Sequence, residues 1–352
     1  MPLFRLRAAR LDDLDSLFAL SKVTNMLNLP ADRGDLEERV TLSSDSFAGK
    51  FPGDDSRRGE YVFVLEDLEA PKADRVIGTS AIIGQHGTRH APHISFEIGT
   101  EENYAPTLDK HVVLKTLELV HSYEGPTEIG GLLLDPRHRK TVTDTGVRLG
   151  TQLSFVRFLY MAMRPDRVQP LILAEMMPPH VHQGGSPLWD SLGAKFTGLS
   201  YMEADARWRT DKDFVEKLFP SYPIYITLLP KEAQDVIGAV DENTRPALRL
   251  LESIGFRFMN HVDPFDGGPH YSARRDEITL VKRSLKRKVV AGDILSPVPA
   301  LIGVEPGRDA GASFRAVATQ VEIGETTVTI APERIAALEI QPGAEATVTP
   351  LA

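Results

Sequence analysis

Residues 130–163 (GGLLLDPRHRKTVTDTGVRLGTQLSFVRFLYMAM) constrain the fold more than any other stretch of this chain. Leu132–Leu134 is a short continuous apolar run, which predicts a strand buried on both faces. Asp135-Pro136 ends this strand, because a proline nitrogen cannot donate a hydrogen bond to a neighbouring strand. The basic run Arg137–Lys140 follows at once. The stretch therefore predicts a buried strand that ends in a basic turn.

A helix is predicted to begin near Thr151, directly after Gly146 and Gly150, because apolar residues then recur at helical spacing as far as Met163. The free N–H groups and the dipole at a helix N-terminus attract anions. Together with the basic turn, they predict a site for a phosphate-bearing ligand. An ordinary α/β connection with a solvated basic surface is the alternative interpretation.

Composition narrows the classes of function. The chain has 352 residues and a formal net charge of −9, which argues against nucleic acid or an anionic membrane as the main partner. It contains no cysteine, so disulfides, thiolate nucleophiles and cysteine-ligated metals are excluded. The N-terminus carries no long apolar segment, and no apolar run approaches transmembrane length. We expect a cytoplasmic enzyme or binding protein.

The order of predicted elements indicates a mixed α/β (α+β) fold. No G-x-G-x-x-G follows the first strand, which argues against a dinucleotide-binding fold. A break is expected at Asn28–Pro30. The two strands predicted at 61–66 and 76–83, before residues 130–163, are expected to form an antiparallel hairpin. The expected elements are a strand at 3–8, helices at 11–23 and 35–46, and hairpin strands at 61–66 and 76–83.

The second half is predicted to contain a buried strand at 170–176 that carries Glu175, a carboxylate that must be paired or have a raised pKa. A structural pair with an arginine and a functional role are both open for it. A helix capped by Ser186 is followed by a predicted strand containing Phe196, and a helix from Thr244 is followed by a strand from Phe256. This repetition is a weak hint of a duplicated α/β lobe. From about residue 289 the pattern predicts a β-rich part with one short helix at 332–338 and a turn at 305–307.

Several stretches, taken together and in order, resemble the arginine N-succinyltransferase family, including its two-subunit arginine/ornithine relatives. The resemblance runs from the N-terminus to about residue 290. The matching segments are YVFVLED (61–67), LLLDPRHRK (132–140), RFLYMA (157–162), AEM (174–176), SPLWDSLG (186–193), YPIYITLL (222–229), EAQDVIGAV (232–240) and DPFDGGP (263–269).

The resemblance implies a GNAT-type acyl-CoA N-acyltransferase fold. The implied parts are an acyl-CoA-binding α/β lobe at 1–195, a second α/β lobe completing the active site at 196–288, and a small β-barrel-like domain at 289–352. The implied reaction moves a succinyl group from succinyl-CoA to the α-amine of L-arginine, or of ornithine, in arginine catabolism. Succinyl-CoA is then a co-substrate, with no permanently bound cofactor or metal. The expected partners are small-molecule substrates, without nucleic acid or membrane, in a homo-oligomer or a hetero-oligomer with a homologous subunit.

Carried over residue by residue, the resemblance places the acyl-CoA contacts at the strand and loop described first. The residues implied are Leu132, Leu133, Arg139, Lys140, Gly146 and Gly150. For the substrate guanidinium we expect carboxylates, with Glu175 and Asp266 as candidates, because a planar guanidinium pairs well with a carboxylate.

The chain departs from the family at the proton donor. The family has a histidine in the form QVHP after EAQDVIG, whereas this chain has AVDE, so Asp241 occupies that position. An aspartate in water is ionised at pH 7 and accepts a proton instead of donating one. Asp241 is therefore a base or orienting group, or His261 or Tyr225 supplies the proton, or activity is lost. A purely structural role for Asp241, as a cap of the Thr244 helix or of a turn there, is a further alternative.

The loop after the predicted strand at 132–134 also differs from the family pattern. Relatives with a recognisable phosphate loop have a compact R-K-x-G-x-G, but about six residues are inserted here and give RKTVTDTGVRLG. Asp144 also brings a negative charge towards the expected phosphates. Two other hypotheses stay open: an acyl-CoA transferase with another acyl group or amine, and a non-catalytic subunit of a succinyltransferase complex.

Overall fold

The computed structural model describes residues 2–23, 32–89, 91–179, 185–208, 211–305 and 314–351. The chain forms two compact units built from separated segments. The first unit comprises Met1–Gln85, Thr127–Pro170 and Arg274–Ala352, and the second comprises His86–Pro126 and Leu171–Ala273. The division into consecutive domains at 1–195, 196–288 and 289–352 stays a prediction.

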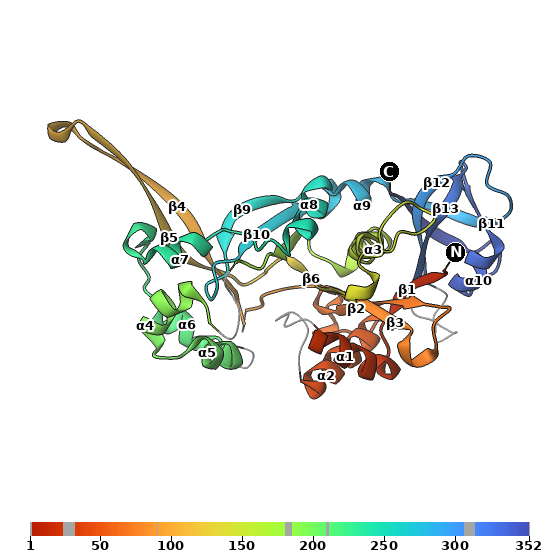
Figure 1. The fold of residues 1–352 in the computed structure, drawn as a ribbon, viewed down its shortest axis with the longest axis horizontal. Coiled ribbons are helices and arrows are strands. Elements are labelled where there is room, and N and C mark those ends of the chain that lie inside the picture. The colour runs from red at the N-terminus through yellow and green to blue at the C-terminus, as the bar shows by residue number, and fades with distance from the viewer. Residues whose placement is uncertain are drawn as a thin grey trace. The chain divides into compact units, whose positions relative to one another are not determined.

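The first unit contains an antiparallel sheet in the order β1–β2–β3–β6. The predicted hairpin of β2 and β3 is confirmed, and the middle of each strand is buried. Helices α1 and α2 cover one face of this sheet and α3 lies on the other (Figure 1). The bounds are β1 Phe4–Ala8, α1 Leu14–Val23 after a 3-10 turn at Leu11–Asp13, α2 Arg33–Phe47, β2 Glu60–Asp67, β3 Val76–Ile83, β6 Thr127–Leu134 and α3 Leu149–Met163.

Strand β6 contains a bulge at its centre. Thr79 pairs with Leu133 and Ala81 pairs with Gly130, so Gly131 and Leu132 together face one residue of β3. Gly131 has φ +59°, a left-handed conformation that glycine adopts without steric cost. The bulge interrupts the regular ladder and leaves backbone groups of β6 outside it.

Helix α3 is the buried helix of the first unit. Eleven of its fifteen residues are buried. It packs closely on the C-terminal strands, since a Cβ added at Gly303 would lie 2.8 Å from Leu159 Cδ2. The close approach explains a glycine at that position.

The C-terminal strands of the first unit close into a barrel. β12 pairs with β13 and β15, β15 with β11, β11 with β14, and β14 with β13, which returns to the start. β13 also pairs with β1, so one strand belongs to both the barrel and the N-terminal sheet. The predicted short helix is confirmed as α10. The bounds are α9 Thr279–Arg283, β11 Leu285–Ala291, β12 Val298–Val304, β13 Arg315–Ile323, β14 Thr327–Ile330, α10 Pro332–Leu338 and β15 Glu345–Pro350.

The second unit is built on a sheet in the order β7–β10–β9–β4–β5–β8. Strands β4 and β5 pair in register over their full length and extend as a ribbon far from the rest of their own unit (Figure 1). At the end of this ribbon, Tyr104, Leu108 and Val113 are exposed. The bounds are β4 His93–Ala105, β5 Lys110–Ser122, β7 Leu171–Glu175, β8 Ile224–Tyr225, β9 Arg257–Val262 and β10 Pro269–Arg274.

The predicted strand at Phe196 is wrong. A π-turn at Trp189–Gly193 continues into helix α4, Ala194–Thr197, which ends at Gly198 with φ +70°. The repeat of helix, glycine, phenylalanine and strand therefore exists only after Thr244, which removes the hint of a duplicated lobe. The core here surrounds Trp189, whose ring stacks on Phe265 at 4.6 Å between centroids. The remaining helices are α5 Tyr201–Trp208, α6 Asp213–Leu218, α7 Lys231–Val236 and α8 Arg245–Ser253.

The mixed α/β class is confirmed by this arrangement of helices and strands. Two predicted breaks, Asn28–Pro30 and most of the turn at 305–307, lie outside the described residues. Within the described ranges, no helix has the length and apolar character needed to cross a membrane.

Candidate functional site

The candidate acyl-CoA contacts all lie in the first unit. Leu132 is partly exposed beside the bulge of β6, whereas Leu133 is buried against α1 and α2. Arg139 and Lys140 are exposed just after the strand. Arg137, by contrast, is held by Asp135 at 2.6 Å, and this hydrogen-bonded pair lowers the pKa of the Asp135 carboxyl. The unpaired basic groups near the strand end are therefore Arg139 and Lys140, as far as the described residues show.

The inserted loop is fixed by contacts to the barrel. Val142 bridges to Arg148, and Gly146 turns the chain with φ +74°. Asp144 Oδ2 accepts a hydrogen bond from Arg334 Nη2 at 3.0 Å, and its carbonyl accepts one from Gln320 Nε2 at 3.0 Å. The negative charge expected near the phosphates is thus paired with a barrel arginine.

Gly150 lies in the first turn of α3, which begins at Leu149, two residues before the predicted start. A Cβ added at Gly150 would meet only Leu134 Cδ2, at the ordinary contact distance of 3.7 Å. Nothing in the described protein requires glycine there. Open space above a helix N-terminus is what close approach of a ligand needs.

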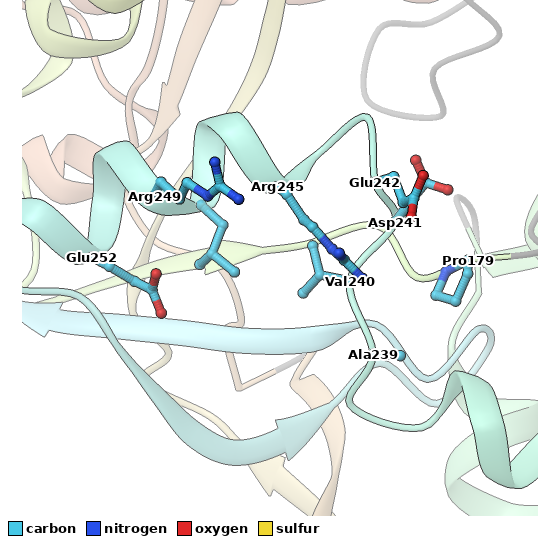
Figure 2. Close-up of a pocket in the computed structure, with 9 residues that line it drawn as sticks. Pro179, Ala239, Val240, Asp241, Glu242, Arg245, Arg249 and Glu252 are labelled. Carbon is cyan, nitrogen blue, oxygen red and sulfur yellow. The ribbon is translucent and has the colours of Figure 1, made fainter.

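In the second unit, Asp241 lines an open pocket of about 610 Å³. Helix α8 provides Arg245, Arg249 and Glu252, and the loop before it provides Asp241 and Glu242 (Figure 2). The Asp241 N–H donates to the Met177 carbonyl at 2.9 Å, which ties this loop to the segment after β7. The pocket therefore presents both carboxylates and guanidinium groups to a bound molecule.

Asp241 also shapes its own turn. Its Oδ1 accepts hydrogen bonds from the Asn243 N–H at 2.8 Å and from Asn243 Nδ2 at 3.0 Å. Its carbonyl accepts the N–H groups of Thr244 and Arg245, where α8 begins. The Asp241 side chain thus closes the turn before α8, whose N-cap residue is Thr244, and because both side-chain bonds use Oδ1 they leave Oδ2 unoccupied.

The two alternative proton donors lie elsewhere in the same unit. His261 on β9 shares a 2.9 Å hydrogen bond with Ser95, and burial lowers its pKa against the opposing charge of Glu97. Tyr225 on β8 donates to Glu101 Oε2 at 2.7 Å, and this hydrogen bond raises its pKa. At neutral pH His261 is therefore mainly uncharged, and the Tyr225 proton is already engaged.

Glu175, at the end of β7, is surrounded by histidines. Its Oε1 lies 3.2 Å from His93 Nε2 and 3.5 Å from His270 Nε2. Burial would raise the pKa of Glu175, but electrostatic attraction to His270 and the hydrogen bond with His93, together with the other neighbouring imidazoles, outweigh it and hold that pKa well below its usual range. A guanidinium role for Glu175 stays a prediction, and its structural neighbours are histidines instead of the arginine considered from the sequence.

Asp266 belongs to the same neighbourhood. Its Oδ1 accepts the Gly268 N–H at 2.7 Å. Burial and the nearby Asp263 raise the pKa of Asp266 above its ordinary value. Burial, with Glu175 next to it, also raises the pKa of Asp263 to about 7. Carboxyls with raised pKa values are weaker partners for a guanidinium.

Sequence reasoning missed the histidines of this cluster. His86, His93 and Glu175 offer ligand atoms that all lie within 4.8 Å of one another, and so do Glu175, Asp263 and His270. The run HGTRHAPH at 86–93 is a short histidine-rich tract and was the signal available. His270 lies in no histidine-rich tract, so no sequence signal pointed to it.

Comparisons with known proteins point to the same family as the sequence motifs. A family model described as "Arginine N-succinyltransferase beta subunit" matches residues 4–280. An arginine N-succinyltransferase of Yersinia enterocolitica is 32% identical over 345 residues, covering 97% of this chain and 96% of that protein. One of Escherichia coli O1:K1 / APEC is 33% identical over 290 residues, covering 82% and 80%. The structure of arginine/ornithine succinyltransferase subunit AI from Pseudomonas aeruginosa superposes with a TM-score of 0.80 at 27% identity, covering 100% of both chains.

The fold and these matches define the chain as an acyltransferase. It belongs to the arginine N-succinyltransferase family.

Proposed function

We propose that this chain transfers a succinyl group from succinyl-CoA to the α-amine of arginine, with ornithine as the alternative acceptor. Membership of the family over nearly its whole length carries this proposal. The acyl-CoA is bound by a GNAT-type strand and loop. The order β1, α1, α2, β2, β3, β6, α3 in the first unit supports that fold.

Two local features support the acyl-CoA site. The bulge at Gly131 and Leu132 frees backbone groups of β6 to hydrogen-bond the pantetheine amides. Gly150 leaves the first turn of α3 open to the pyrophosphate, with Arg139 and Lys140 as exposed cations nearby in sequence. The pairing of Asp144 with Arg334 keeps its charge from opposing the phosphates.

The chemistry requires the amine to lose a proton, the amine nitrogen to bond the thioester carbon, and the carbon–sulfur bond to break. Asp241 is the proposed base, since its carboxylate lines the pocket and Oδ1 alone carries its hydrogen bonds. The proton that Asp241 accepts can then pass to the CoA thiolate. Proton transfer of this kind contributes roughly 10²–10⁴-fold, and orientation of the reactants contributes the larger share.

The amino acid is proposed to occupy the Asp241 pocket. Arg245 and Arg249 provide guanidinium donors for its carboxylate, while Glu242 and Glu252 provide carboxylates for its side chain. The pocket thereby has groups of the right sign for both ends of a basic amino acid.

The test is release of CoA thiol from succinyl-CoA, followed with a thiol reagent, in the presence of arginine, ornithine or lysine. Because the chain has no cysteine, the protein contributes no thiol signal. Release with arginine or ornithine is expected. Release with acetyl- or glutaryl-CoA but not succinyl-CoA would assign another acyl group. Absence of release, together with no calorimetric binding of any CoA ester, would assign a non-catalytic subunit.

We further propose that the chain forms a homo-oligomer through the β4–β5 ribbon and acts in the cytoplasm, where succinyl-CoA is produced by central metabolism. The exposed Tyr104, Leu108 and Val113 at the end of the ribbon are apolar groups that a second copy would cover.

A further inference from the structure

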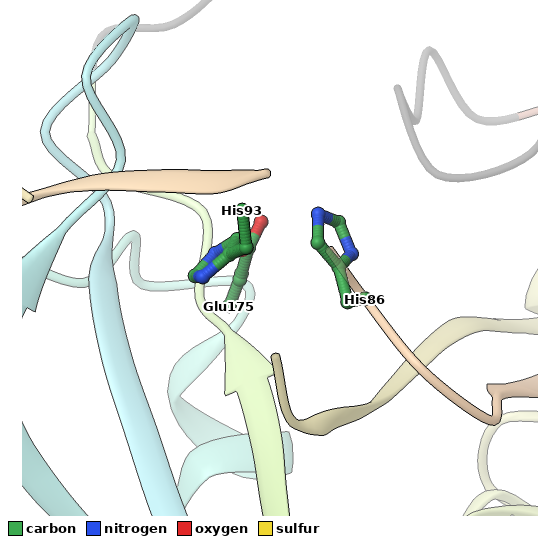
Figure 3. A group of neighbouring side chains, drawn as sticks. All are labelled: His86, His93 and Glu175. Carbon is green, nitrogen blue, oxygen red and sulfur yellow. The ribbon is translucent and has the colours of Figure 1, made fainter. Parts of the chain in front are cut away.

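A cluster of histidines and carboxylates in the second unit lies outside the pocket proposed for the amino acid. His93 lies at the start of β4, Glu175 at the end of β7, and His86 on the segment that precedes β4 (Figure 3). The His86 and His93 rings meet edge to face at 4.7 Å between centroids. Two segments that are distant in sequence, residues 86–93 and the end of β7, thus bring two imidazoles and one carboxylate together.

Three carboxylates lie close together at this cluster. Glu175 and Asp263 offer oxygens within 4.8 Å of one another, and the Asp266 N–H donates to Asp263 Oδ1 at 3.0 Å. Among the described residues, no lysine or arginine lies within ion-pairing distance of any of the three. Neighbouring carboxylates of this kind are stabilised by protonation, by charged histidines or by a metal ion.

The distances suit a metal. Two ligand atoms that are each about 2.0–2.1 Å from one tetrahedral ion lie roughly 3.3 Å apart. His93 Nε2 and Glu175 Oε1 are 3.2 Å apart, and a His86 ring nitrogen lies within 4.8 Å of both. The Glu175 side chain is 28% exposed, which leaves an entry path from solvent.

We propose that His86, His93 and Glu175 bind a divalent transition-metal ion of the zinc type. Two imidazoles and a carboxylate are a known donor set for Zn²⁺ that leaves a fourth position for water. The ion would tie the segment at 86–93 to the end of β7. This site is separate from the proposed amine pocket and does not depend on the proposed reaction.

The second group, Glu175 with Asp263 and His270, is the competing choice of ligands. Asp263 is the weaker ligand, because its Oδ1 already accepts the N–H groups of Phe265 and Asp266 at 2.7 and 3.0 Å. His270 is fully buried and stacks beside His93 at 5.4 Å between centroids. We assign it an orienting role, in which its Nε2 faces Glu175 Oε1 and holds that carboxylate in place.

The test uses the full chain, stripped with EDTA and titrated with Zn²⁺ by calorimetry, with bound metal measured by elemental analysis. Uptake of one Zn²⁺ per chain is expected, and Co²⁺ should give the visible absorption of a low-coordinate site. His86→Gln and His93→Gln should each weaken Zn²⁺ binding by more than about 100-fold, whereas His270→Gln should lose about 10–100-fold, as outer-shell partners do.

His111→Gln is the matched control, because His111 is a largely exposed histidine on β5 of the same unit. The Zn²⁺ affinity of the His111→Gln variant should equal that of the unchanged chain. If a histidine variant fails to fold by circular dichroism, the near-isosteric Glu175→Gln replaces it. Substoichiometric uptake by the unchanged chain overturns the proposal. So does a greater loss with His270→Gln than with His86→Gln, which would move the site to the second group.

Discussion

Asp144 Oδ2 and Arg334 Nη2 lie 3.0 Å apart, so the inserted loop before α3 is joined by an ion pair to the helix α10 of the barrel. Arg334 is largely buried, with a side-chain exposure of 9%, and Asp144 is 28% exposed. An insertion between strand and helix thereby gains a fixed position from residues almost two hundred places further along the chain.

Arg334→Met should lower the free energy of unfolding by about 1–3 kcal/mol, because it leaves the partly buried Asp144 charge without its partner. The double variant with Asp144→Asn should lose less than the sum of the single variants, since the two residues share one interaction. Urea denaturation measures both. Lys286→Met, at an exposed position of β11, is the control. Additive losses would show that the pair is not coupled.

Gly150→Ala should raise the KM for succinyl-CoA at least tenfold, which corresponds to a loss of about 1.4 kcal/mol in binding free energy, while leaving stability unchanged or slightly higher. The added Cβ has room in the protein, with its nearest heavy atom at 3.7 Å, but it would occupy the space proposed for the pyrophosphate. Gly185→Ala, whose Cβ would meet its nearest atom at 4.0 Å, is the control. An unchanged KM would remove the phosphates from this helix end.

Asp241→Asn should lower kcat by roughly 10²–10⁴-fold with an unchanged Kd for succinyl-CoA, since the amide keeps the Oδ1 acceptor but cannot take a proton. Steady-state kinetics and calorimetry measure the two quantities. Asp241→His, which restores the residue of the family motif, should retain activity. A normal rate in Asp241→Asn would assign the residue to its capping turn alone.

Glu66→Gln should destabilise the first unit by about 3–5 kcal/mol at neutral pH, because Glu66 is buried between Arg5 and Arg7, each at 2.8 Å. Burial opposes ionisation of Glu66, but the hydrogen bonds and positive charges of Arg7 and Arg5 together outweigh it and lower the pKa of Glu66 below 4.5. The folded state therefore binds fewer protons than the unfolded state, so this stabilisation is present above pH 4.5 and disappears as pH falls through the lowered pKa. Urea titrations at several pH values should show that the difference in free energy of unfolding between Glu66→Gln and the unchanged chain shrinks as pH falls. Glu69→Gln, at an exposed position, should show no difference in free energy of unfolding at any pH.

Replacing Tyr104 and Leu108 by serine should reduce the mass of the particle in light scattering, because the two side chains are 59% and 73% exposed at the end of the ribbon. Leu228→Ser, at a site 79% exposed but outside the ribbon, should leave the mass unchanged. An unaltered mass in the ribbon variant would place any interface elsewhere.

Local patterns predicted much of the first unit. The β2–β3 hairpin, the strand β6 followed by α3, and α10 all carry strong signals, namely apolar runs bounded by turns or proline. The β4–β5 ribbon was not predicted. Its residues carry charges on both faces, as EEN and LDK show, because both faces of the distal ribbon are exposed and alternation is lost.

The candidate site was predictable only where it is local. Gly150 was found in the loop before α3, and Asp241 was found because it occupies the histidine position of the family motif after EAQDVIG. The cluster around Glu175 combines His86, His93 and His270, which are brought together by strand order in the second unit, and no spacing in the sequence encodes that order. The strand expected at Phe196 failed because a helical segment simply continued through a glycine, Gly193.

Strand β1 pairs with β2 on one side and with β13 on the other, where Leu6 faces Ala316. During synthesis on the ribosome, one edge of β1 therefore has no pairing partner until more than three hundred further residues have been made. An unpaired edge held for so long is a site for misassociation, so this chain should depend on chaperones for high yield and should refold slowly from denaturant.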